Sequence, residues 1–167
     1  MKVLGVDPGS IVVGYGVVET GTAHFARLVE CGVLRTDRGA PLPRRLVAIH
    51  DGLSELIARH HPDCMAVEDI FCGKNPRSSA VLGHARGVIL LSAEQANLSI
   101  AEYSPATIKK TVVGRGAALK PQVGYMVAQL LRLADPPTPA DAADGVAVAL
   151  THLLRGRSRA ISALVSR

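Results

Sequence analysis

The chain has 167 residues, 48% of them hydrophobic and 20% charged, a composition that excludes a largely disordered protein and fits one globular domain. No stretch approaches the roughly 18 consecutive apolar residues of a membrane span, so we expect no membrane partner, and three cysteines without a C-x-x-C pair indicate reduced thiols and a cytoplasmic location. The net charge of +5 is concentrated in residues 71–125, where seven basic and two acidic side chains favour a polyanionic partner such as nucleic acid over a chance fluctuation.

The first part of the chain predicts strands. Short apolar runs separated by turn residues lie close together, which indicates an antiparallel meander. The predicted strands cover residues 3–7, 11–19 and 25–36. A polar connection then leads into an amphipathic helix over 42–57, and Pro62 follows that helix as a stop.

Beyond this helix, strands and helices alternate. Ser104-Pro105 is a typical helix start, with Ser as the N-cap and Pro at the first helical position. Apolar periodicity over longer segments identifies the other helices. The predicted strands lie at 64–68 and 98–103, and the predicted helices at 77–96, 105–112, 123–131 and 140–154.

This order of elements predicts an α/β fold with a five-stranded mixed sheet. The first three strands form its antiparallel part, and crossover helices connect the parallel strands. We expect one domain over residues 1–155. The remaining residues, 156–167, carry arginines and no acid, and we expect them to form a disordered basic tail.

Four carboxylates stand where predicted elements end or begin. Asp7 and Glu68 end strands, while Asp141 and Asp144 open the last helix, three residues apart and therefore on one helix face. If this helix starts near the strand ends, the four side chains converge, and their mutual repulsion requires a cation. Oxygen ligands suit Mg²⁺ or Mn²⁺, and two such ions about 3.5–4 Å apart are the usual apparatus for attack on a phosphodiester.

Each carboxylate also has an ordinary structural interpretation. Asp7 before Pro-Gly is a typical turn residue, and Glu68 fits an exposed strand end. Asp141 and Asp144 fit a helix start, where acidic side chains interact favourably with the helix dipole. The catalytic interpretation therefore depends on the combination of these residues with the basic segment.

Basic side chains on two sides of the predicted strand ends suit contacts to phosphates. The alternative interpretation of these basic side chains is that they form an ordinary solvated helix face. Phe71, one of five aromatic residues, lies in the loop after Glu68 and suits stacking on a base, with core packing as the alternative. The residues that we expect to contact DNA are Phe71, Lys74, Arg77, Lys109, Lys110, Arg115 and Lys120.

With these motifs the chain resembles the RuvC family of bacterial Holliday-junction resolvases. The resemblance begins with Gly-Val-Asp-Pro-Gly-Ser at 5–10 and ends with Asp-Ala-Ala-Asp at 141–144 followed by Thr151-His152, so it covers nearly the whole chain. Between them, in order, lie the matching segments 14–16, 66–68, 71, 74–75, 82–83, 85–87, 109, 111–114, 120 and 122–123.

The resemblance implies an RNase H-like fold and a homodimer that makes paired symmetric nicks in four-way DNA junctions, leaving 5′-phosphate and 3′-hydroxyl ends, in recombination and repair. It implies that the four carboxylates are catalytic and bind two Mg²⁺ ions per subunit, with Mn²⁺ as a substitute. Phe71 matches an aromatic that stacks at the junction centre, and Lys109 and Lys120 match lysines that contact DNA. The implied partners are a junction-binding protein and a branch-migration motor of the RuvA and RuvB type.

One position departs from the family pattern. Asp69 follows Glu68 where a neutral or variable residue is expected, and it either points to the opposite sheet face or adds negative charge near the metals.

Three other functions remain open. A nuclease of the same fold acting on RNA or on other branched DNA is the closest. Asp7-Pro8-Gly9 also resembles the phosphate-binding turn of actin-like ATPases and sugar kinases, but those proteins need two such lobes. A catalytically inactive DNA-binding module would lack a carboxylate, and all four are present.

Overall fold

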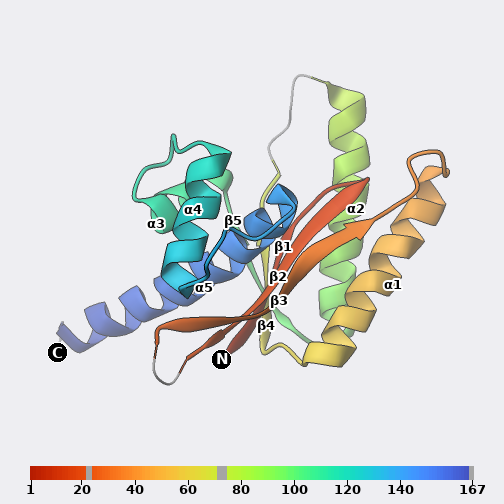
Figure 1. The fold of residues 1–167 in the computed structure, drawn as a ribbon. Helices are drawn as coiled ribbons and strands as arrows, with labels where there is room; N and C mark the ends of the chain where they lie inside the picture. Colours follow the sequence, from red (N-terminus) through yellow and green to blue (C-terminus); the bar gives the residue numbers. More distant parts are fainter. Residues whose placement is uncertain (22–23, 71–74, 166–167) are drawn as a thin grey trace.

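The computed structural model describes residues 1–21, 24–70 and 75–165, and the side chains within these ranges as far as Arg157. Its centre is a five-stranded sheet with the strand order β3-β2-β1-β4-β5 (Figure 1). The strands are β1 (Lys2–Asp7), β2 (Val12–Thr20), β3 (Ala26–Arg35), β4 (Cys64–Glu68) and β5 (Ser99–Tyr103).

The direction of the strands follows from the length of their connections. Short turns join β1, β2 and β3, which therefore pair antiparallel. Strands β4 and β5 each follow a helix and pair parallel, β4 with β1 and β5 with β4. The predicted mixed sheet is confirmed, including its antiparallel N-terminal part.

Helices cover both faces of this sheet. Helices α1 and α2 pack on one face, and α3, α4 and α5 on the other (Figure 1). The helices are α1 (Leu42–His60), α2 (Pro76–Gln95), α3 (Pro105–Val113), α4 (Lys120–Leu131) and α5 (Ala140–Val165). No helix in the described part of the chain is long and apolar enough to cross a membrane.

Helix α5 is longer than the sequence pattern predicted. It continues past residue 154 to Val165, so the segment after Gly156, expected to be disordered, is helical in its backbone through Val165. Two arginines in this part of the helix contact aromatic rings. The Arg155 guanidinium lies 5.9 Å from the centre of the Tyr103 ring, and that of Arg157 lies 5.7 Å from the Phe25 ring. Such cation–π contacts favour continuation of the helix along the body of the protein.

Two apolar cores follow from the alternation of side chains along the strands. On β4, Cys64 and Ala66 face α3, α4 and α5, while Met65 and Val67 face α1 and α2. All four are buried. Because both faces of β1 and β4 are covered, these strands are almost continuously apolar until the carboxylates at their ends.

Glycines allow α5 to lie directly on β1 and β2. A Cβ atom at Gly16 of β2 would lie 2.6 Å from the Cα atom of Val146, and one at Gly145 of α5 would lie 2.5 Å from the Cα atom of Tyr15. A Cβ atom at Gly5 of β1 would collide with the α5 backbone. Real Cβ atoms do not approach other atoms this closely, so only glycine permits this helix–sheet distance.

We predict that Gly145→Ala lowers the free energy of unfolding by about 1–3 kcal/mol, because the new methyl group forces α5 away from Tyr15. Thermal unfolding measures this change, because each kcal/mol lowers the Tm by about 2–4 °C for a chain of this size. The control is Gly156→Ala in the same helix, where a Cβ atom meets nothing within 4 Å among the described residues. This control is expected to be neutral or slightly stabilising. An unchanged midpoint for Gly145→Ala would contradict the close packing.

Candidate active site

Asp7 and Glu68 are brought together by the parallel pairing of β1 and β4. Val6 pairs with Val67, so Asp7 and Glu68 follow at the same edge of the sheet. By alternation both side chains point to the face that carries α5. The sequence placed each residue at a strand end, and the register makes these ends neighbours.

The start of α5 completes the cluster. Asp141 lies in the first turn of the helix, and Asp144 lies one turn further on. One carboxylate oxygen of Asp7, one of Asp141 and one of Asp144 lie within 4.8 Å of one another. Glu68 is outside this group of three but lines the same cleft as Asp7 and Asp144. The four carboxylates therefore lie close together in the structure, as the positions of the predicted elements suggested.

The cleft has a volume of about 170 Å³ and combines charged and apolar walls. Lys109 of α3 and Lys120 of α4 line it together with the acids. Its apolar wall comes from three helices and consists of Pro105, Ile108, Val123 and Ala147. Sequence reasoning did not include these residues in the site. Periodicity places them on helix faces that point inward, but it does not show that the three faces meet at one cleft.

Burial and repulsion raise the pKa values of two carboxyl groups. The pKa of Asp7 rises from 3.8 to about 7, first because burial disfavours the charged form and then because Glu68, Asp144 and Asp141 repel its charge. The pKa of Glu68 also rises to about 7, through burial and repulsion by Asp144. Without a counterion Asp7 and Glu68 therefore each bind a proton about half of the time near neutral pH.

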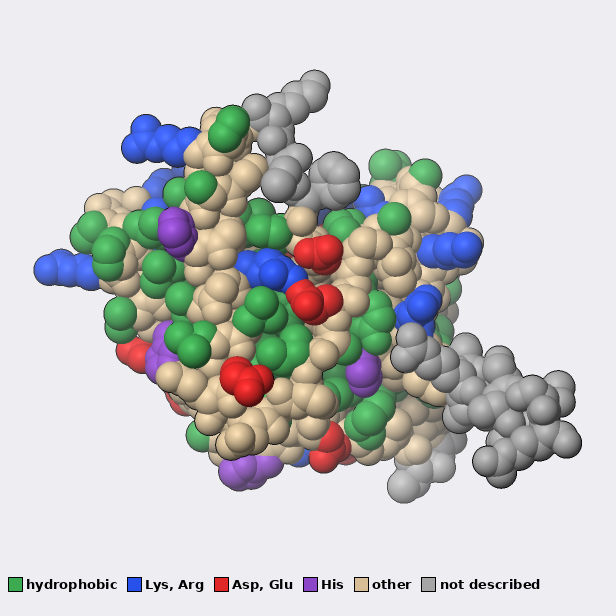
Figure 2. Space-filling model, turned by 180° about the vertical axis from the view of Figure 1, so that it is seen from behind, with side chains coloured by type: hydrophobic (Ala, Val, Ile, Leu, Met, Phe, Trp, Pro, Cys, Tyr) green, Lys and Arg blue, Asp and Glu red, His purple; other side chains and the backbone are tan. Residues whose placement is uncertain are grey.

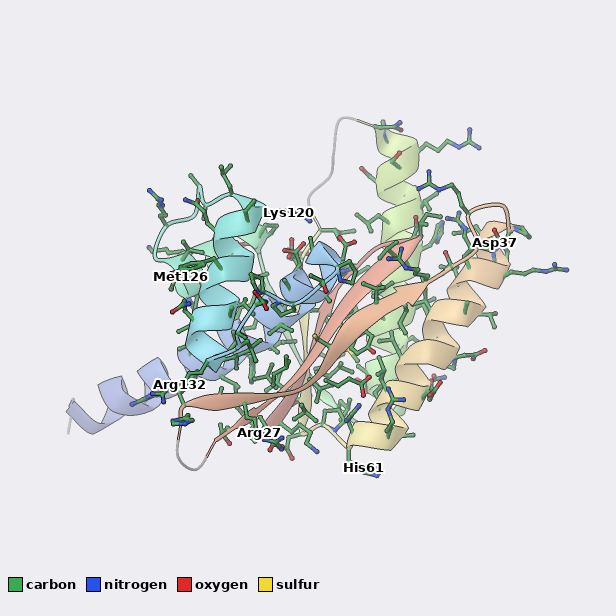
Figure 3. All side chains as sticks on the ribbon, viewed as in Figure 1. Arg27, Asp37, His61, Lys120, Met126 and Arg132 are labelled. Atoms are coloured by element: carbon green, nitrogen blue, oxygen red, sulfur yellow. The ribbon has the colours of Figure 1, made fainter. Side chains whose placement is uncertain are left out.

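Lys120 supplies part of the missing positive charge. Its Nζ atom donates a hydrogen bond of 2.6 Å to Oδ2 of Asp144 and lies 3.9 Å from Oδ1 of Asp141. The hydrogen bond to Asp144 is the main reason that the pKa of Lys120 is raised. Figure 3 shows Lys120 at the first turn of α4, beside the start of α5. This ammonium group also opposes the upward pKa shifts of Asp7 and Glu68.

These residues fit a divalent metal ion. The candidate ligands are carboxylate oxygens of Asp7 in β1 and of Asp141 and Asp144 in α5, which is the donor type that Mg²⁺ and Mn²⁺ prefer. The raised pKa values of Asp7 and Glu68 show that burial and, after it, repulsion by neighbouring carboxylates disfavour their charged forms despite the nearby lysines. A bound cation would relieve this repulsion.

The other predicted DNA contacts lie outside the cleft. Lys110 and Arg115 are exposed, on α3 and in the loop after it, and Arg77 is exposed in the first turn of α2. Figure 2 shows basic side chains exposed on the side of the molecule where α3 lies. Phe71 and Lys74 lie outside the described residues, so the structure neither supports nor contradicts their predicted roles.

Comparison with known proteins agrees with this geometry. The family model described as crossover junction endodeoxyribonuclease RuvC matches residues 3–152. RuvC of Pelotomaculum thermopropionicum is 48% identical over 152 residues, covering 91% of this chain and 92% of that protein. RuvC of Halorhodospira halophila is 51% identical over 151 residues, covering 90% of this chain and 89% of that protein.

A solved structure has the same fold. Thermus thermophilus RuvC in complex with Holliday junction substrate superimposes with a TM-score of 0.87 at 34% sequence identity, over 95% of this chain and 96% of that chain. The match in sequence and in fold over almost the full length establishes that the chain belongs to the RuvC family.

Proposed function

We propose that the protein is a crossover junction endodeoxyribonuclease that resolves four-way DNA junctions by paired symmetric nicks, leaving 5′-phosphate and 3′-hydroxyl ends. The observation that carries this proposal is the acidic cleft between β1, β4 and α5, in a chain whose relatives bear that name. Its biological role is in homologous recombination and DNA repair. The substrate of the related Thermus protein, a Holliday junction, supports the same substrate here.

In this proposal the four carboxylates are the catalytic residues and hold two Mg²⁺ ions per subunit, for which Mn²⁺ can substitute. When bound, the ions supply an activated water and stabilise the leaving oxygen. Asp7 is central because one of its carboxylate oxygens lies within 4.8 Å of oxygens of both α5 carboxylates, and because Glu68 also contributes to raising its pKa. The apolar wall limits the access of bulk water, which strengthens the electrostatic interactions within the cleft.

Lys109 and Lys120 would attract the phosphate of the scissile strand to the acidic cleft. A phosphodiester next to four carboxylates is repelled unless positive charge lies at the rim, and these two lysines line the cleft. Lys110, Arg115 and Arg77 would extend the phosphate contacts along the strand, together with Lys74 and the stacking side chain of Phe71.

Two further parts of the proposal concern assembly. A homodimer would present two equivalent clefts to a substrate with two equivalent scissile strands. The remaining partners are a junction-binding protein and a branch-migration motor of the RuvA and RuvB type, in the cytoplasm.

The direct test of this function is incubation of the protein and Mg²⁺ with a synthetic four-way junction, beside linear duplex and RNA–DNA hybrid. Paired nicks on the junction alone are expected. Cleavage of the hybrid instead would favour an RNA-directed nuclease of the same fold.

Asp7→Asn should reduce the rate of junction cleavage at least roughly 100-fold, equivalent to ~2.7 kcal/mol of activation free energy, because it removes one anionic ligand. Junction affinity should stay within about threefold, since repulsion near the phosphates decreases rather than increases. Gel-based cleavage and binding assays measure the two quantities separately. Asp135→Asn, at an exposed acid outside the cleft, is the control. Loss of binding together with cleavage would contradict the assigned role.

Metal binding should stabilise the protein more at pH 8 than at pH 5. Because Asp7 and Glu68 have raised pKa values in the folded state, the metal-free free energy of unfolding falls as pH rises from about 4 to about 7. Above that range the deprotonated cluster binds cations best. At 100 times the Kd, the stabilisation is about 2.7 kcal/mol. Thermal unfolding in chelator and in excess Mg²⁺ measures it, and equal metal stabilisation at both pH values would contradict this linkage.

Lys109→Ala should weaken junction binding and reduce the slope of log affinity against log salt concentration by about one, because one phosphate contact is lost. A salt titration of binding without metal measures this slope. Arg27→Ala is the control, at an exposed arginine in the β2–β3 hairpin, at the opposite end of the sheet (Figure 3). If the slope for Lys109→Ala equals that of the unmodified protein, Lys109 does not contact phosphate.

A further inference from the structure

Arg86 of α2 binds two carboxylates on the sheet face opposite the cleft. Its Nη2 atom lies 3.5 Å from Oδ1 of Asp69 and also forms an ion pair with Oε2 of Glu102. The Arg86 side chain is only 18% exposed, whereas the two acids are about half exposed. One guanidinium therefore connects α2 with β5 and with the residue that follows β4.

The two carboxylates lie next to the end of β4 that carries Glu68. Asp69 comes directly after Glu68, and its backbone N–H donates a 2.8 Å hydrogen bond to the carbonyl oxygen of Tyr103 in β5. Glu102 pairs with Val67, one residue before Glu68. Arg86 therefore binds the side chain of the residue that follows Glu68 and the side chain of the β5 residue that pairs with the residue before Glu68.

Alternation of side chains separates the two sites. Glu68 points into the cleft, where it lies with Asp7, and Asp69 points to α2, where it meets Arg86. Of the two positions that the sequence allowed for Asp69, the structure has the one on the opposite face. Its charge is neutralised there and is not added to the acidic cleft.

Stability alone does not account for Arg86. Its Nε atom is buried and has no hydrogen-bond partner in the described part of the chain, an arrangement that is unfavourable for stability. Ion pairs with carboxylates that are about half exposed also contribute little net stability, because water screens the attraction and desolvation of the guanidinium offsets it. Since one guanidinium binds carboxylates on two neighbouring strands, it also fixes those strand ends relative to each other, which indicates a geometric role.

We propose that Arg86 is a positioning residue of the active site, which binds Asp69 and Glu102 and thereby holds the end of β4 so that Glu68 enters the cleft beside Asp7. This inference rests on the proposed nuclease function. Arg86 acts through the backbone of β4 and touches neither the cleft nor the DNA strand that the cleft would receive.

The test compares Arg86→Met and Arg86→Lys with the unmodified full-length protein in single-turnover cleavage of a four-way junction, over a range of Mg²⁺ concentrations. Arg86→Met should reduce the maximal rate about tenfold and raise the Mg²⁺ concentration for half-maximal rate at least threefold. Junction affinity without metal should change less than twofold. Arg86→Lys should recover part of the rate, because it keeps the charge but not the planar fork.

Asp69→Asn is a second variant, which tests the same ion pair without replacing the mostly buried Arg86. It should reduce the cleavage rate about threefold with an unchanged unfolding temperature, since the side chain is 55% exposed. If Asp69 acted only as unwanted negative charge, the same change would raise the rate. Arg27→Met is the matched control, because it removes an exposed arginine–carboxylate pair far from the cleft, Arg27 with Glu19.

Two results would overturn the inference. One is unchanged rate and metal dependence for Arg86→Met. The other is a loss of activity that follows only the loss of folded protein, with Asp69→Asn behaving as the unmodified chain. If the unmodified protein does not cut junctions, the proposed function fails instead. Mn²⁺ binding measured by thermal shift then still tests Arg86, because Arg86→Met should weaken it at least threefold and an equal shift would reject the role.

Discussion

The close contact between α5 and the sheet is the constraint on which the site depends. Gly16 and Gly145 remove the side chains that would otherwise separate the helix from β2. Because the helix lies directly on the backbone of the strands, the carboxylates of its first two turns reach the end of β1, within 4.8 Å of Asp7. A helix separated from the strands by intervening side chains would hold these carboxylates farther from Asp7.

This proximity is electrostatically unfavourable in the absence of cations. Asp7 and Glu68 have pKa values of about 7 since burial and neighbouring carboxylates both oppose their charged forms. Lys120 relieves part of this repulsion through its hydrogen bond to Asp144. The site therefore stores unfavourable energy in the folded protein, a common property of catalytic clefts. Divalent cations are ligands whose charge matches such a cleft, whereas a phosphate would need those cations or the lysines to offset its repulsion by the carboxylates.

The sheet has different roles on its two faces. The face that carries α3, α4 and α5 holds the carboxylates and the two lysines. On the other face, α1 and α2 pack against the strands through apolar side chains. Arg86 lies on the face that carries α1 and α2, and its ion pairs with Glu102 and with Asp69, the residue after Glu68, join α2 to the ends of β5 and β4. In the role proposed for Arg86, the position of Glu68 on one face depends on ion pairs on the other.

The sequence by itself determined the elements, the fold class and the four carboxylates, because strand alternation, helix periodicity and capping are local patterns and the family motifs run along nearly the whole chain. Tertiary structure decided what depends on contacts between distant segments. The parallel register of β1 and β4 placed Glu68 beside Asp7. Contacts at the glycines set the distance between α5 and the sheet. The inner faces of three helices formed the apolar wall of the cleft. Local patterns also did not predict that Asp69 pairs with Arg86 or that α5 continues to Val165. Both features involve contacts between side chains far apart in the chain.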